Sequence, residues 1–294
     1  MYIRLIGLIT VFLLIAKIVS ASVTSEKLGT VSFSNSGSDK VQKHFIRGVA
    51  ALHSFWYPEA LAEFEETTEA DPTFAMGYWG QAMTYNHPLW EEQDLKSAKA
   101  ALSKITNTLN ITKREQDYIH AARLLYGEGN KTIRDESYSK AMKSIYSNYP
   151  NDLEAACFYS LSLLGIAKNA ENKLPLQVEA GAIALEVFQK SSDHPCAAHY
   201  TIHAFDTPDL ARLALPSAKR FADIAPASAH AQHMPAHIFI QLGMWKEATK
   251  SNKKGWSTSV AWVKRKNLPK TNRDYHSLQW SHYTNLQQGL LKDA

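Results

Sequence analysis

The stretch FIRGVAALHSFWYPEALAEFEETTEADP, residues 45–72, decides the fold class of this chain. Apolar side chains recur at helical spacing on both sides of a short break at Tyr57-Pro58. These side chains are Phe45, Val49, Leu52, Ala60 and Phe64. Because proline is tolerated in the first turn of a helix and not in its interior, the break separates two helices. The stretch therefore predicts a helix, a turn and a second helix.

The same stretch resembles the tetratricopeptide repeat (TPR) family, whose unit of about 34 residues is a pair of helices. The family pattern has Gly or Ala, Ala, Phe and Pro at four positions, and Gly48, Ala60, Phe64 and Pro72 fit all four. Weaker matches follow at Tyr78, Ala82, Ala214, Ala218, Phe221 and Pro226. A single repeat cannot bury its apolar faces. The resemblance implies an all-α, TPR-like solenoid of antiparallel helix pairs, with a general helical bundle as the alternative.

The chain divides into three segments. Residues 1–21 have a basic start, an apolar run and small residues at the end, which is typical of a cleaved secretory signal peptide, with an uncleaved anchor as the alternative. Residues 22–40 are rich in Ser, Gly and Thr and predict a flexible leader. Residues 41–294 form the repeat domain. No polar capping repeat follows Leu290, so we expect a truncated piece of a longer protein or a short-tailed relative.

A secretory route gives meaning to two further features. The tripeptides beginning at Asn110 and Asn130 are sequons for N-linked glycosylation, which favours a secreted or extracellular glycoprotein. Cys157 and Cys196 are the only two cysteines. An oxidising compartment would allow them to pair, and two buried free thiols are the alternative.

Composition excludes several classes of function. The net charge is +4 with scattered Lys and Arg, which gives no support to nucleic-acid binding. No apolar run after the signal is long enough for a bilayer, so we expect no membrane association after cleavage. Glycine-rich phosphate or dinucleotide motifs and a serine-hydrolase elbow are also missing.

Histidine is concentrated in one part of the chain. Six of the twelve histidines lie between residues 194 and 237. His199 and His203 are four residues apart, as are His233 and His237, so each pair would share a helix face. Three or four imidazoles can hold copper, zinc or iron without thiolate. These four histidines are the predicted metal ligands.

Several other residues are predicted as alternate ligands or as partners of the ligands: His53, His87, His230, Asp206, Asp274 and His276. In the TPR family the first helix of each pair lines a concave groove. The resemblance implies that the helix containing these histidines lines such a groove. Pro235 would disrupt the interior of such a helix. We therefore expect a helix to begin close to Met234, with His230 and His233 in the preceding loop.

The leading hypothesis is a secreted TPR-like protein whose concave face binds a transition metal and uses it on a small substrate. The segment from His199 to His203 has the histidine spacing of a zincin but lacks its glutamate, which argues against that kind of protease. A further alternative is that the histidines lie in the core and donate hydrogen bonds to backbone carbonyls. The main alternative is a secreted scaffold without chemistry, which grips a peptide or protein partner in an aromatic and histidine-lined groove.

Overall fold

The computed structural model describes residues 27–106 and 111–294, and in them the chain is an array of helices packed in consecutive antiparallel pairs. The helices are α1 (Asp39–His53), α2 (Tyr57–Ala70), α3 (Ala75–Met83), α4 (Leu95–Ser103), α5 (Lys113–Leu125), α6 (Lys131–Asn148), α7 (Leu153–Ala167), α8 (Leu174–Lys190), α9 (Pro195–Ala204), α10 (Ala211–Ile224), α11 (Ala229–His233), α12 (Pro235–Gln241), α13 (Trp245–Arg265), the 3-10 helix η1 (Lys270–Asn272) and α14 (Tyr275–Gln287). The strands β1 (Asn86–His87) and β2 (Glu92–Gln93) pair antiparallel in a small hairpin. The predicted all-α class is confirmed.

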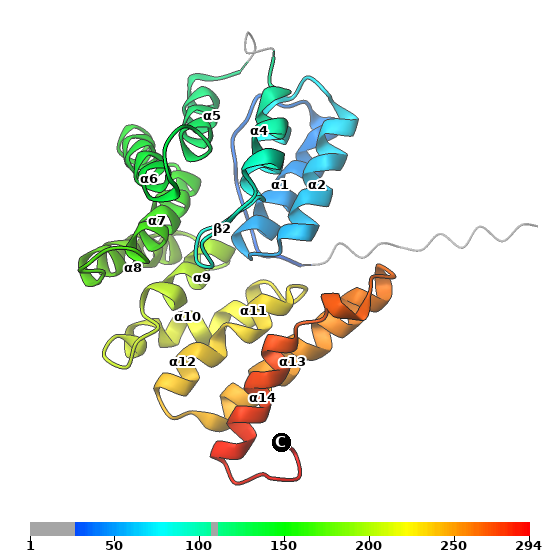
Figure 1. Cartoon of the computed structure of the whole chain (residues 1–294), viewed down its shortest axis with the longest axis vertical. Helices are drawn as coiled ribbons and strands as arrows, with labels where there is room; N and C mark the ends of the chain where they lie inside the picture. The colour runs from blue at the N-terminus through cyan, green and yellow to red at the C-terminus, as the bar shows by residue number, and fades with distance from the viewer. Residues whose placement is uncertain (1–26, 107–110) are drawn as a thin grey trace, which may run out of the picture.

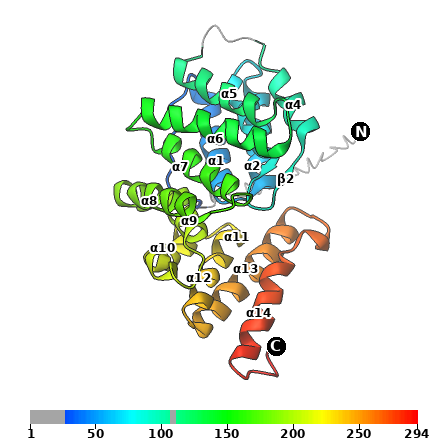
Figure 2. The same ribbon diagram turned by 60° about the vertical axis from the view of Figure 1, so that its left-hand side comes forward.

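The array runs from one end of the molecule to the other. Helices α1–α7 form one half, α10–α14 form the other, and α8 and α9 lie between them (Figures 1 and 2). The last pair, α13 and α14, lies side by side along the second half. As a result, residues from the α1–α2 turn, α9, α11 and α14 can reach a common space.

Close packing of the first helix pair follows from its small residues. A Cβ atom added at Gly48 would lie 2.7 Å from Cε1 of Phe64, and one added at Gly80 would lie 2.3 Å from Cδ1 of the same ring. Phe64 and Ala60 are fully buried. Since any larger residue would push the helices apart, glycine at both positions lets α1 and α3 approach the Phe64 ring. Helix α2 ends at Ala70, just before Pro72.

The predicted flexible leader is wrong for the part that the structure describes. Residues 27–38 lie extended against the helices, and Leu28 and Phe33 are buried. The amide of Thr30 donates to the carbonyl oxygen of Asp193 at 2.9 Å. The polar composition of the segment concealed two apolar anchors, whose burial outweighs the entropy of an ordered chain end.

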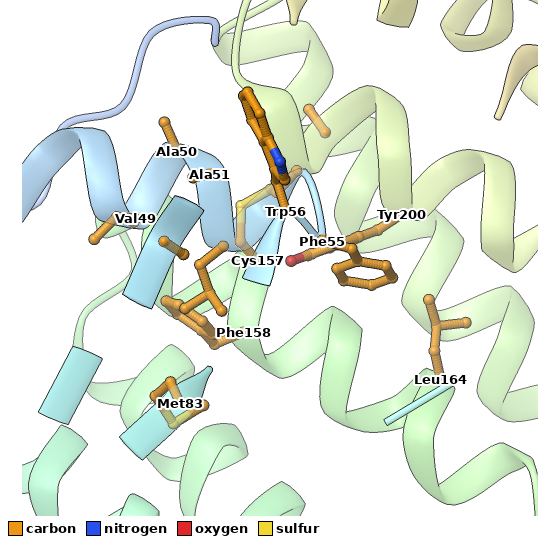
Figure 3. Packing of buried hydrophobic residues seen from close by; sticks show 14 of the residues in the cluster. Val49, Ala50, Ala51, Phe55, Trp56, Met83, Cys157, Phe158, Leu164 and Tyr200 are labelled. Carbon is orange, nitrogen blue, oxygen red and sulfur yellow. A yellow bond between two sulfur atoms is a disulfide. The ribbon is translucent and has the colours of Figure 1, made fainter. Parts of the chain in front are cut away.

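A disulfide links Cys157 in α7 to Cys196 in α9, so the paired alternative holds (Figure 3). The Cα atoms are 6.0 Å apart. Because α8 separates these helices in the sequence, the bridge ties together two first helices of neighbouring pairs and fixes α9 against the first half of the molecule.

The break at Pro235 differs in one respect from the prediction. Helix α12 does begin at Pro235, with Met234 as its N-cap. His230 and His233 do not lie in a loop, however, because the single turn α11 carries both. The Ser228 hydroxyl caps this turn by accepting from the amide of Ala231, which lets so short a helix form.

Two predictions about the secretory route fall on residues outside the described ones, namely the signal peptide at residues 1–21 and the sequon asparagine Asn110. Asn130 is exposed and caps α6, with its Oδ1 accepting from the amide of Ile133 at 3.0 Å. Among the described helices, none has both the length and the apolar character needed to cross a bilayer.

Candidate metal centre

Five of the chain's histidines line one cavity of about 750 Å³ between the two halves of the molecule. Its walls come from the α1–α2 turn, the hairpin loop, α7–α9, α11–α13 and the start of α14. Its polar lining includes His203, Asp206, His230, His233, His237 and His276. His199 lies behind them and is fully buried.

A first histidine triad joins α9 to α11. Nε2 of His199 lies 3.0 Å from Nε2 of His203 and 3.0 Å from Nε2 of His230. All three ring nitrogens lie within 4.8 Å of one another. Nitrogens at this separation can each be about 2.1 Å from a single ion. The structure therefore moves His230, predicted as an alternate, into the same group as the predicted ligands His199 and His203.

The protonation of His199 is fixed by its partner. Its Nδ1 lies 2.6 Å from the backbone carbonyl oxygen of His53, an atom that can only accept. Nδ1 must therefore carry the proton, and Nε2 of the neutral ring is left with a lone pair. That one lone pair faces the nitrogens of two other imidazoles, and it can accept a well-aligned hydrogen bond from only one of them.

A second triad joins α11 and α12 to α14. Nε2 of His233 lies 3.0 Å from Nε2 of His237, and a nitrogen of His276 completes the group within 4.8 Å. His276 is exposed, whereas His233 is buried. The predicted ligands His233 and His237 thus belong to a different triad from His199 and His203, with His276 as their third member.

Both ring nitrogens that face each other in the second triad are acceptors. His237 donates through Nδ1 to Oδ2 of Asp206 at 2.7 Å, and His233 donates through Nδ1 to Oδ1 of Asn252 at 2.6 Å. Each Nε2 therefore points a lone pair at the other. Two lone pairs 3.0 Å apart repel unless a cation lies between them.

Burial keeps four of the imidazoles in the triads neutral. Burial lowers the pKa of His199 to about 3 and, with the nearby His237, lowers the pKa of His233 to about 3. It also lowers the pKa of His203 and His230 well below the ordinary value. These imidazoles are neutral at pH 7, and a neutral imidazole is the metal ligand.

Asp206 is placed to orient His237 rather than to bind metal itself. Burial would raise the pKa of Asp206, but hydrogen bonds from His237 and Gln241 outweigh it, so this pKa lies below the ordinary value. The carboxylate is therefore ionised, and it fixes the tautomer and direction of the His237 ring. Carboxylates commonly play this part behind metal-ligating histidines.

Each triad has its own aromatic cover. The Phe55 ring lies 4.3 Å from His199, 5.5 Å from His203 and 5.6 Å from His230, measured between centroids. The backbone of Phe55 has φ 51°, a left-handed conformation that costs a bulky residue free energy. Trp280 takes the same place in the second triad, with centroids 5.2, 4.4 and 5.3 Å from His233, His237 and His276.

His53 belongs to a separate buried network. Its Nδ1 accepts from the hydroxyl of Tyr200 at 2.8 Å, and its Nε2 donates to Glu154 at 2.6 Å. His194 donates to the other oxygen of Glu154 at 2.9 Å. Burial would raise the pKa of Glu154, but His194 and His53 outweigh it and lower it to about 2. Cys157 lies beside this group but offers no thiolate, because it is in the disulfide.

The remaining predicted residues lie apart from the triads. His87 contacts Glu92 and the carbonyl oxygen of Thr84, and its ring stacks on Tyr57. Asp274 caps α14 by accepting from Ser277, at the edge of the cavity. Neither side chain is among the described groups that can hold an ion, so their part as alternates or as partners of the ligands stays a prediction.

Three functional partners were missed by sequence reasoning: the carbonyl of His53, Asn252 and Glu154. A backbone carbonyl leaves no mark in a sequence. Asn252 lies in a polar helix where an amide is unremarkable. Glu154 offered a signal, because it is an acid in the otherwise apolar segment LEAACFYSL.

A comparison of the chain with family models and with curated proteins found no match.

Proposed function

We propose that this protein binds a transition metal in the cavity through its histidine triads and uses it on a small substrate. The observation that carries the proposal is the convergence of ring nitrogens whose protons are committed elsewhere, on His199, His233 and His237. The lone pair of His199 faces the first triad, and those of His233 and His237 face each other in the second, so a cation is favoured at each of these places. Hydrogen bonding among the rings themselves cannot satisfy this arrangement.

The donor set favours copper or zinc. All six ligand atoms are imidazole nitrogens, whereas thiolate would favour a structural zinc or iron–sulfur site and carboxylates would favour magnesium or calcium. Iron usually takes a carboxylate beside two histidines. Such an ion supplies a Lewis acid and lowers the pKa of a bound water.

The cavity also suits a small ligand. Trp56, Trp90 and Trp262 give it apolar walls, and Lys168 and Lys173 stand at its margin. Two exposed lysines would attract an anionic or polar group. This lining favours a small organic substrate that stacks on the aromatic walls, with the histidines at the base of the cavity.

We further propose that the chain is a TPR-like protein of the secretory pathway. The contact of Gly48 with the Phe64 ring supports the repeat, because it occurs at the positions where the family pattern has these residues. The disulfide between Cys157 and Cys196 supports an oxidising compartment. The exposed Asn130 is open to a glycan.

Metal analysis of the purified protein tests the proposal. We expect bound copper or zinc, with a lower content in His203→Ala and in His237→Ala and an unchanged content in His120→Ala, whose histidine is exposed on α5. Circular dichroism would confirm that each variant folds. If the purified protein is metal-free and takes up neither ion in calorimetry, the proposal is contradicted. That result would favour a scaffold that binds a peptide or protein partner, an alternative supported by the aromatic lining of the cavity.

A further inference from the structure

The histidines of the cavity fall into two groups of three rather than one group of four. Within the first triad, His199 lies 4.7 Å from His203 and 4.9 Å from His230 between ring centroids. Within the second, His233 lies 4.9 Å from His237 and 4.8 Å from His276. His203 and His230 of the first triad are 6.0 Å apart, and the distances between triads are slightly longer, with His203 6.4 Å from His237 and His230 6.3 Å from His233.

These separations decide how many ions fit. With metal–nitrogen bonds of about 2.1 Å, two imidazoles on one tetrahedral ion have centroids about 5.2 Å apart. The distances from His199 and from His233 to their triad partners lie near this value. The ring nitrogens of each triad lie within 4.8 Å of one another, so each triad can hold an ion of its own.

Each triad also has supporting contacts of its own. The first has the carbonyl of His53 behind His199 and the ring of Phe55 over it. The second has Asp206 behind His237 and Trp280 over it. Contacts of this kind orient metal ligands. A single ion would not explain why such contacts occur twice around one cavity.

We propose that the two triads form a two-ion centre, with one transition-metal ion in each and both ions facing the same cavity. The proposal rests on the proposed function, that this cavity binds metal. Helix α11 connects the two centres, since His230 belongs to the first and His233 to the second. Two ions facing one cavity would supply two Lewis acids to the same bound substrate.

Counting bound ions tests the proposal. The mature protein, stripped with chelator, would be titrated with Zn²⁺ and examined by native mass spectrometry. We expect two ions in the wild type and in His120→Ala, one in His203→Ala, one in His276→Ala and none in the double variant. His276 is exposed and His203 is half-buried, so neither replacement empties a core position.

A second measurement tests whether the ions share one space. In protein loaded with Cu²⁺, we expect electron paramagnetic resonance to show coupled spins, with a half-field transition or with less signal than the copper content requires. His276→Ala should restore the full signal of one isolated ion.

The outcomes separate this inference from the proposed function. One ion in the wild type, lost in both His203→Ala and His276→Ala, would overturn the two-ion centre and leave metal binding intact. Two ions with uncoupled spectra would overturn the shared space. Binding of neither Zn²⁺ nor Cu²⁺ by the wild type would overturn the inference and the proposed function together.

Discussion

Nδ1 of His199 lies 2.6 Å from the backbone carbonyl oxygen of His53, a residue 146 positions earlier in the chain. This single hydrogen bond sets the tautomer of His199 and so turns its Nε2 lone pair toward His203 and His230. It also places the end of α1 directly behind the first triad. The stability of the first half of the molecule and the geometry of the cavity are therefore coupled.

Asp206→Asn should weaken Zn²⁺ binding roughly 10- to 100-fold, because a neutral amide accepts the proton of His237 Nδ1 more weakly than the carboxylate does. Competition against a chromophoric chelator measures the dissociation constant. Asp209→Asn, an exposed change in the same loop, is the matched control and should bind as the wild type does. Equal dissociation constants for the two variants would rule out an orienting role for Asp206.

Glu154→Gln should lower the free energy of unfolding by about 3 kcal/mol or more, since a buried partner of two histidines loses its charge. Urea denaturation followed by circular dichroism measures the change. Glu179→Gln is the control: its carboxylate accepts from Tyr159 on the exposed side of α8, and we expect about 0.5 kcal/mol or less. A wild-type midpoint for Glu154→Gln would mean that the network carries little stability.

Loss of the Cys157–Cys196 disulfide should cost about 4 kcal/mol, the chain-entropy value for cysteines separated by 39 residues. The melting temperature of the wild type should fall by roughly 10 °C in a reductant that reaches the bond. Cys157→Ser/Cys196→Ser should melt at that lower temperature with or without reductant. If the double variant melts with the untreated wild type, the bridge contributes nothing to stability.

Acid should destabilise the metal-free protein at a higher pH than its carboxylates alone would require. Burial lowers the pKa of His199 and of His233 to about 3, against 6.5 in the unfolded chain. Below pH 6.5 the unfolded state therefore takes up protons that the folded state does not, and stability falls until the pH reaches about 3.

Between pH 6.5 and 5 we expect each of these two histidines to cost about 2 kcal/mol. Urea midpoints of chelator-treated protein at pH 7.5, 6 and 5 measure the effect, and His120→Ala should follow the same profile because its ring is exposed. An unchanged midpoint from pH 7.5 to 5 would contradict neutral, buried imidazoles in the folded state.

Much of the helical architecture could be predicted because it depends on local pattern. The spacing of Phe45, Val49 and Leu52 determines which face of α1 is buried, and Pro235 sets where α12 begins. The leader could not be predicted in the same way. Leu28 and Phe33 are isolated apolar residues in a polar segment, and only the surfaces of distant helices give them a place to pack.

The sequence by itself determined the helices, their pairing and the concentration of histidine between residues 194 and 237, because each depends on neighbours within a few turns of chain. Only the tertiary structure decided how the histidines divide. It brought His230 to the α9 pair, added His276 from α14 and placed the carbonyl of His53 behind His199. Ligand groups are set by distances of a few ångströms between helices far apart in sequence, and those distances depend on how whole helices pack.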